Sequence, residues 1–182
     1  IATLAQSAIE EGANVTIFSS DKDLMQLVSD DIKMYDPIRN IFIDMDKVQE
    51  KFGVTPDKVI AVQALIGDKV DNIPGVPGVG VKTASSLISE FQTVENLVKK
   101  YEAIDKDRIR NLISENIDKI ILSKKLVTLL KTVEIDTNLQ DLELATLNLN
   151  KLLVFTKLME LNTLSKRISS QLEEFNLSLI HI

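Results

Sequence analysis

The chain has 182 residues, 45% of them apolar, which is enough to bury the core of one or two small domains. It contains no cysteine, which excludes disulfides and thiolate metal sites, and no run of about 20 apolar residues that would span a membrane. The net charge of −6 argues against coating of DNA by bulk electrostatic attraction, but it leaves open the local capture of phosphate by backbone amides.

In chain order, the pattern predicts a short α/β segment followed by a mainly helical body. The α/β segment is expected to contain a helix over residues 1–11 that ends at Gly12, a strand over 15–18, a helix of about two turns through Val28, strands over 31–35 and 40–43, and a helix over 46–52 that ends at Gly53. The body is expected to contain helices over 56–67, 81–91 and 94–101, one or two helices between 108 and 130, an extended segment over 132–136, and a Leu-rich helical tail over 150–175.

Two carboxylates, Asp68 and Asp71, come at the end of the helix predicted for residues 56–67. Their spacing of three places them on one helical face. Acids at the negative end of a helix dipole cost about 0.3–1 kcal/mol each, so a bound divalent cation would explain the pair. The alternative, which stays open, is that Asp71 and Asn72 cap the turn before Pro74.

Three glycines, Gly75, Gly78 and Gly80, follow this pair and precede the helix predicted from Val81. Such a turn exposes backbone N–H groups that bind phosphate together with the helix N-terminus, and Lys82 could reach a second phosphate oxygen. A nucleotide-binding P-loop is not supported, because Val81 precedes the lysine and a helix precedes the turn. A tight helix–helix connection remains the structural alternative.

A second acidic pair, Asp21 and Asp23, directly follows the strand predicted over 15–18. This is the carboxyl end of the strand, where open α/β sheets place ligands. Either residue could instead cap the helix that runs through Val28. Combined with Asp68 and Asp71, the pair favours a site for a hard cation such as Mg²⁺ or Mn²⁺.

The segment from Gly67 to Ala84, Gly-Asp-Lys-Val-Asp-Asn-Ile-Pro-Gly-Val-Pro-Gly-Val-Gly-Val-Lys-Thr-Ala, resembles the helix–three-turn–helix motif of the 5′ nuclease family. That family comprises the flap endonucleases and the 5′→3′ exonuclease domain of bacterial DNA polymerase I. Residues 20–28, Ser-Asp-Lys-Asp-Leu-Met-Gln-Leu-Val, are similar to its second acidic motif. The resemblance covers roughly residues 1–167 and is strongest to the polymerase I version. Val81 departs from the family, which commonly has an acid at that position.

The resemblance implies an α/β remnant followed by a mainly α-helical helix–three-turn–helix region of the helix-hairpin-helix type, which binds DNA. It divides the chain into four parts. Residues 1–45 are a remnant of the nuclease core and residues 46–131 are the DNA-binding region. Residues 132–176 lead toward a following domain, and residues 177–182 are an uninformative tail. The resemblance also implies an amino-terminally truncated fragment that holds at most half of the metal cage and is inactive, or nearly so, by itself.

The implied activity is metal-assisted hydrolysis of phosphodiester bonds in DNA replication and repair, with two Mg²⁺ or Mn²⁺ ions in the complete site. The implied catalytic and metal-ligating residues are Asp21, Asp23, Asp68 and Asp71. The implied DNA-binding residues are Gly75, Val76, Gly78, Val79, Gly80, Lys82 and Thr83, with a K⁺ ion on the carbonyls of the turn from Gly75 to Gly80.

The implied partners are duplex DNA with a 5′ flap or 5′ end and a polymerase domain in the same full-length chain. The implied location is the bacterial cytoplasm, in association with the nucleoid and not with a membrane. Two other hypotheses stay open: a non-catalytic helix-hairpin-helix module that binds DNA, and a purely structural helical domain.

Overall fold

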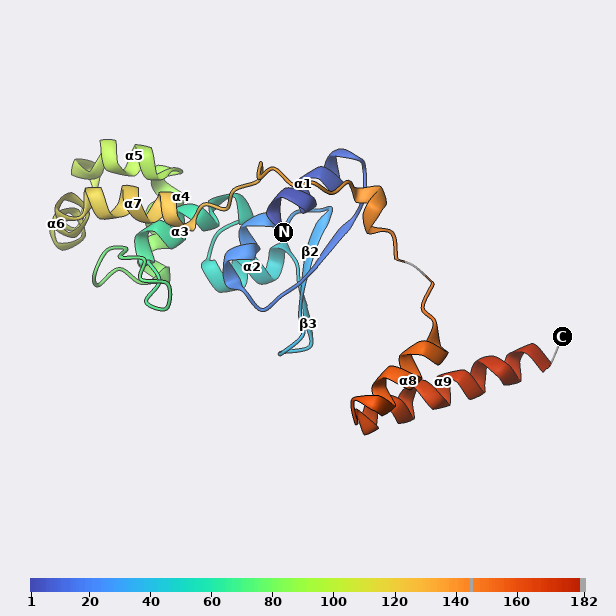
Figure 1. Cartoon of the computed structure of the whole chain (residues 1–182). Coiled ribbons are helices and arrows are strands. Elements are labelled where there is room, and N and C mark those ends of the chain that lie inside the picture. Colours follow the sequence, from blue (N-terminus) through green and yellow to red (C-terminus); the bar gives the residue numbers. More distant parts are fainter. Residues whose placement is uncertain (145, 181–182) are drawn as a thin grey trace. The chain divides into compact units, whose positions relative to one another are not determined.

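The computed structural model describes residues 1–144 and 146–180, and the chain divides into two compact units, Ile1–Leu139 and Gln140–Ile182 (Figure 1). The larger unit contains both the α/β segment and the helical body, so the acidic pairs and the glycine turn belong to one unit. The further division of that unit at residue 45 remains a prediction.

The α/β segment is a three-stranded sheet in the order β1-β2-β3, in which β1 and β2 are parallel and β2 and β3 are antiparallel. Its helices join the strands and continue into the helical body. The elements are α1 (Ala2–Glu10), β1 (Val15–Phe18), the 3₁₀ helix η1 (Lys22–Leu27), β2 (Ile32–Asp36), β3 (Ile41–Ile43) and α2 (Met45–Phe52).

The register of the sheet pairs Ile17 with Met34 and Met34 with Ile43, and all three side chains are buried. Because side chains alternate along a strand, this face joins the core. η1 was expected to be an ordinary helix, but it is 3₁₀ over its whole length. Its four consecutive residues Leu24 to Leu27 are all buried, so side chains pack into the core on every side of η1. An amphipathic α-helix would bury only one stripe of residues.

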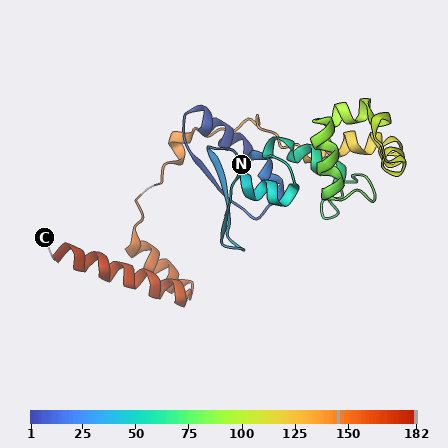
Figure 2. The same cartoon turned by 180° about the vertical axis from the view of Figure 1, so that it is seen from behind.

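The helical body is built around α3, an almost entirely apolar helix that packs against α7 and α4 (Figure 1, Figure 2). The expected helix over 94–101 ends early, and the region from 108 to 130 holds two helices that meet at Asn116. The elements are η2 (Pro56–Lys58), α3 (Val59–Ile66), α4 (Val81–Phe91), α5 (Val94–Lys99), η3 (Tyr101–Ala103), α6 (Asp107–Glu115) and α7 (Ile117–Val127).

Residues 132–136 form no paired strand, and η4 (Leu139–Leu142) follows them. The expected helical tail is a pair of helices, α8 (Leu149–Leu158) and α9 (Asn162–Ile180), packed against each other. The chain reverses at Glu160, whose φ of 55° is incompatible with a continuous helix.

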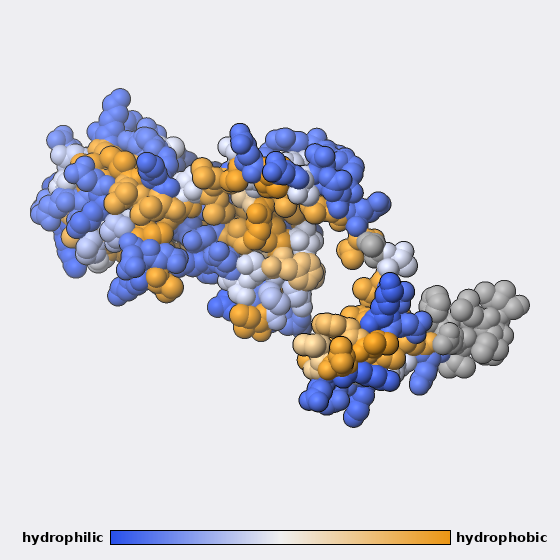
Figure 3. Space-filling model, in the orientation of Figure 1, coloured by the Kyte–Doolittle hydropathy of each residue, from blue (hydrophilic) through white to orange (hydrophobic). Residues whose placement is uncertain are grey.

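Apolar side chains remain exposed on α8, among them Val154, Phe155 and Leu158. Figure 3 shows orange, hydrophobic surface on this unit. Within residues 1–144 and 146–180, no helix combines the length and the apolar character needed to cross a membrane.

Candidate metal centre and nucleic-acid interface

Asp21 caps η1, as the structural alternative predicted. Its Oδ1 accepts a hydrogen bond from the backbone N–H of Asp23 at 2.9 Å, and its own N–H donates to Ser19 Oγ at 3.1 Å. This local turn begins directly after β1, so the cap also fixes Asp23 at the carboxyl end of the strand. Capping uses one carboxylate oxygen of Asp21 and is therefore compatible with a cation on the other.

Asp23 faces the helical body, where its Oδ1 accepts a hydrogen bond from Nε2 of Gln63 on α3. Burial raises the pKa of Asp23, the Gln63 hydrogen bond opposes the rise, and the nearby charges of Asp21 and Asp68 add to it. The Asp23 carboxylate is thus held where its negative charge is poorly solvated. A cation would stabilise the ionised form.

Asp68 and Asp71 do not share a helical face, so that expectation is wrong. α3 ends at Ile66, Gly67 turns the chain with a φ of 68°, and Asp68 pairs with Ile73 through backbone hydrogen bonds of 2.9 and 2.7 Å. Both acids therefore lie on a tight turn, with Asp68 buried at its base and Asp71 exposed. Gly67 decides this, because its positive φ ends the helix before the first acid.

The Lys22 ammonium joins the two acidic pairs by forming an ion pair with Oδ2 of Asp68. This bond lowers the pKa of Asp68, and it raises the pKa of Lys22, to which Asp23 and Asp71 also contribute. Sequence reasoning did not assign Lys22 to the site, although it lies between two predicted ligands. Its ammonium occupies Oδ2 of Asp68, one of the oxygens expected to bind a cation.

The acids around Lys22 offer carboxylate oxygens, the donor class that a hard divalent cation prefers. The fit is partial. Among the described residues, no three His, Asp or Glu side chains lie close enough together to hold a metal ion. The residues that would hold the cation from this chain are Asp23 and Asp68, with Asp21 and Asp71 beside them.

Only part of the glycine turn is available to a phosphate. Gly75 is buried, and its N–H donates to Ser123 Oγ on α7 at 3.0 Å. The N–H of Val76 donates to Leu65 O at 2.7 Å, and the side chains of Val76 and Val79 belong to the core. Ser123 is another residue that sequence reasoning missed, since nothing in its local sequence indicates a partner 48 residues earlier.

Gly78, Gly80 and Lys82 at the start of α4 are exposed, and Thr83 is half-buried. A Cβ added to Gly80 would meet no atom within 4 Å, so this backbone lies open. Fewer than the seven predicted DNA-binding residues are therefore open to a phosphate, because Gly75, Val76 and Val79 face inward.

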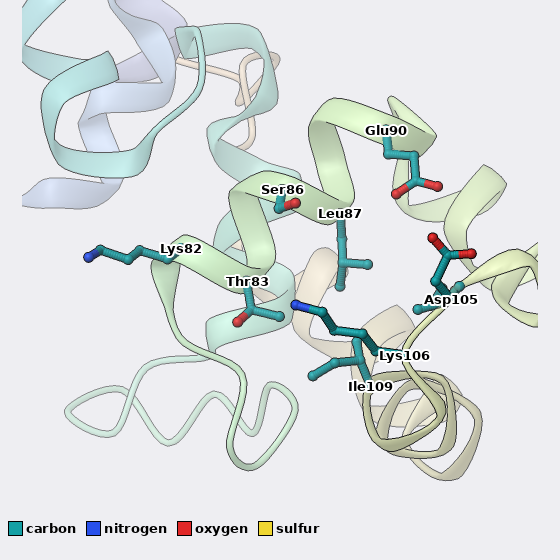
Figure 4. Close-up of a pocket in the computed structure, with 9 residues that line it drawn as sticks. Lys82, Thr83, Ser86, Leu87, Glu90, Asp105, Lys106 and Ile109 are labelled. Atoms are coloured by element: carbon teal, nitrogen blue, oxygen red, sulfur yellow. The ribbon is translucent and has the colours of Figure 1, made fainter.

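A cavity of about 480 Å³, lined by both polar and apolar side chains, opens beside α4, between this helix and the segment that leads into α6 (Figure 4). Figure 4 shows Lys106 extending toward the end lined by Thr83, while Lys82 projects away and Glu90 and Asp105 lie at the other end. The cavity thus adds a second lysine, which the sequence did not single out, next to the predicted DNA-binding residues.

The sequence models of two family domains together match residues 1–150. Residues 1–53 match the 5′-3′ exonuclease N-terminal resolvase-like domain, and residues 54–150 match the 5′-3′ exonuclease C-terminal SAM fold. The chain belongs to the 5′-3′ exonuclease family. The resemblance inferred from the acidic motif and the glycine turn is thereby confirmed, as is the α/β segment followed by a helical region.

Relatives of this 5′-3′ exonuclease family member include DNA polymerase I of Rhizobium leguminosarum, which is 46% identical over 169 residues, 93% of this chain and 17% of the relative. The 5′-3′ exonuclease of Aquifex aeolicus is 38% identical over 168 residues, 92% of this chain and 57% of the relative. The chain therefore spans only part of the length of each relative.

Among solved structures, a mutant of T5 5′-exonuclease matches with a TM-score of 0.63 and 22% identity, over 69% of this chain and 53% of that chain. The bacteriophage T5 flap endonuclease in a complex with DNA and metal ions matches with a TM-score of 0.62 and 22% identity, over 69% and 48% of the two chains. At this identity the likeness establishes the fold.

Proposed function

We propose that this chain is part of a metal-dependent 5′→3′ exonuclease or flap endonuclease that hydrolyses phosphodiester bonds in DNA replication and repair. The observation that carries the proposal is the ion pair between Lys22 and Asp68, because Lys22 directly precedes Asp23 and the pair therefore links the two acidic segments. Membership of the 5′-3′ exonuclease family supports it, since the turn with Asp68 lies in one matched domain and Asp23 in the other.

Mg²⁺ or Mn²⁺ fits the proposal, because these ions prefer carboxylate oxygens and retain water ligands. Two bound divalent cations would supply Lewis acids that activate water and stabilise the leaving oxygen. Asp23 and Asp68 would hold the cation, Asp21 would fix the turn that carries Asp23, and Asp71 would add negative charge. A cation on Oδ2 of Asp68 would displace the Lys22 ammonium from that oxygen.

The exposed end of the glycine turn would hold the phosphate backbone of duplex DNA with a 5′ flap or 5′ end. Gly78 and Gly80 allow close approach of the backbone, and Lys82 and Thr83 contribute a charge and a hydroxyl. Gly75, Val76 and Val79 would act from within by shaping the turn. A K⁺ ion on the turn carbonyls, a polymerase domain in the same full-length protein and a nucleoid-associated bacterial cytoplasmic location belong to the same proposal.

Calorimetric titration of the 182-residue chain with Mn²⁺ tests the metal site. We expect Asp68→Asn to weaken Mn²⁺ binding at least tenfold, because a buried ligand is lost. The matched control is Asp46→Asn, which removes an equal charge from the exposed first turn of α2. Equal affinities for the two variants would contradict the metal assignment.

Fluorescence anisotropy with a labelled 5′-flap duplex tests the nucleic-acid part and separates the alternatives. We expect binding that strengthens when Mn²⁺ replaces EDTA, with little or no cleavage by the chain alone. A non-catalytic module predicts DNA affinity that is indifferent to EDTA and to Asp68→Asn, and a purely structural domain predicts no affinity at all.

A further inference from the structure

The side chain of Gln63 is the one polar side chain of α3, a helix whose sequence is otherwise Val, Ile, Ala and Leu. It is 3% exposed. Burial of an amide is unfavourable unless its donors and acceptors find partners, so a glutamine at this position calls for a specific contact. That contact is with Asp23, 40 residues earlier in the chain.

The Gln63 amide engages the carboxylate from one side only. Its Nε2 donates to Oδ1 of Asp23, which leaves the second carboxylate oxygen for a cation. Because the amide is neutral, it holds the carboxylate without competing for it as an ion would. Gln63 therefore differs from Lys22, whose ammonium must move away from Asp68 before a cation can bind.

The other half of the amide has no hydrogen-bond partner in the part of the chain that the structure describes. Oε1 of Gln63 is buried and accepts no hydrogen bond from any described residue. Buried acceptors are almost always satisfied, so the missing donor is expected to be a molecule other than the protein. A cation held by Asp23 would bring such donors, since Mg²⁺ and Mn²⁺ keep water ligands whose O–H groups point outward.

We propose that Gln63 is a positioning residue of the metal site: its Nε2 fixes the Asp23 carboxylate, and its Oε1 accepts a hydrogen bond from a water molecule that coordinates the cation. The inference rests on the proposed metal-dependent function and adds a residue to it. Groups that orient ligands in this way commonly change metal affinity by 10–100-fold when they are removed.

The test is Mn²⁺ titration calorimetry on the full chain with Gln63→Met, which keeps the side-chain length and removes both amide groups. We expect at least a tenfold loss of Mn²⁺ affinity. The matched control is Gln26→Met: Gln26 is also buried, but its amide bonds the backbone of Val127 and Leu129 at 2.9 and 3.1 Å. We expect Gln26→Met to lower the melting temperature and leave the affinity of the folded protein unchanged.

A double-mutant cycle separates positioning from general disruption of the fold. In an Asp23→Asn background, Gln63→Met is expected to have no further effect on Mn²⁺ affinity, because the carboxylate that it orients is absent. An undiminished further loss in that background would overturn the inference, and so would an unchanged affinity for Gln63→Met alone while Asp68→Asn weakens binding. A wild-type chain that binds no Mn²⁺ would overturn the inference together with the metal site.

Discussion

Substitution of Gly75 by Ala is expected to destabilise the larger unit strongly. Gly75 has a φ of +55°, and an added Cβ would lie 2.4 Å from the backbone nitrogen of Gly67. The left-handed conformation costs an L-residue about 1–2 kcal/mol. The overlap is with backbone, which no rotamer change can relieve, and overpacking of this kind costs about 1–3 kcal/mol. Together these terms give a loss of about 3 kcal/mol.

Two other glycines of the same unit separate the contributions. Gly12 has a φ of +82° with no atom within 4 Å of an added Cβ, so Gly12→Ala carries the conformational cost alone, about 1–2 kcal/mol. Gly80 has neither a positive φ nor a close neighbour, so Gly80→Ala is expected to change stability by no more than about 0.5 kcal/mol.

Thermal unfolding followed by circular dichroism measures all three variants. For a unit of this size, about 3 kcal/mol corresponds to a drop in melting temperature of roughly 10 °C. Gly12→Ala should fall between Gly75→Ala and Gly80→Ala. The reasoning is refuted if Gly75→Ala and Gly12→Ala melt within about 2 °C of each other, because the contact between Gly75 and Gly67 would then have no energetic weight.

Two further predictions concern contacts made across the fold. Ser123→Ala leaves the buried N–H of Gly75 without an acceptor and should lower the free energy of unfolding by about 1–3 kcal/mol. Ser114→Ala removes an exposed hydrogen bond to Asn111 O and should lower it little. Urea denaturation measures both variants, and equal losses of stability would contradict the role assigned to Ser123. Lys22→Met removes the ammonium that competes with a cation for Asp68. Such an ion pair stabilises by about 1 kcal/mol, so its loss should raise the Mn²⁺ affinity about fivefold. The control is Lys69→Met, which removes the same charge from an exposed neighbour of Asp68. If calorimetry finds that Lys22→Met binds Mn²⁺ no more tightly than this control, Lys22 does not compete with the cation.

Local signals predicted the elements that depend on local forces. The apolar run Val15–Phe18 is β1, and the stretch after Gly80 is α4 with the bounds Val81–Phe91. Gly53 ends α2 with a φ of 70°, as a glycine at a helix end predicts. The prediction failed where packing overrides local preference, as in η1, whose four buried residues in succession have no helical period.

The sequence by itself determined that this chain belongs with the 5′ nucleases, because Asp21, Asp23, Asp68 and the glycine turn form a motif of residue types and spacings. Only the tertiary structure decided which groups surround those acids. Lys22 on Asp68, Gln63 on Asp23 and Ser123 on Gly75 are partners from separate elements. The physical reason is that hydrogen bonds and ion pairs depend on positions in space, and these are fixed only when α3 packs against α7 and the turn after β1 meets α3.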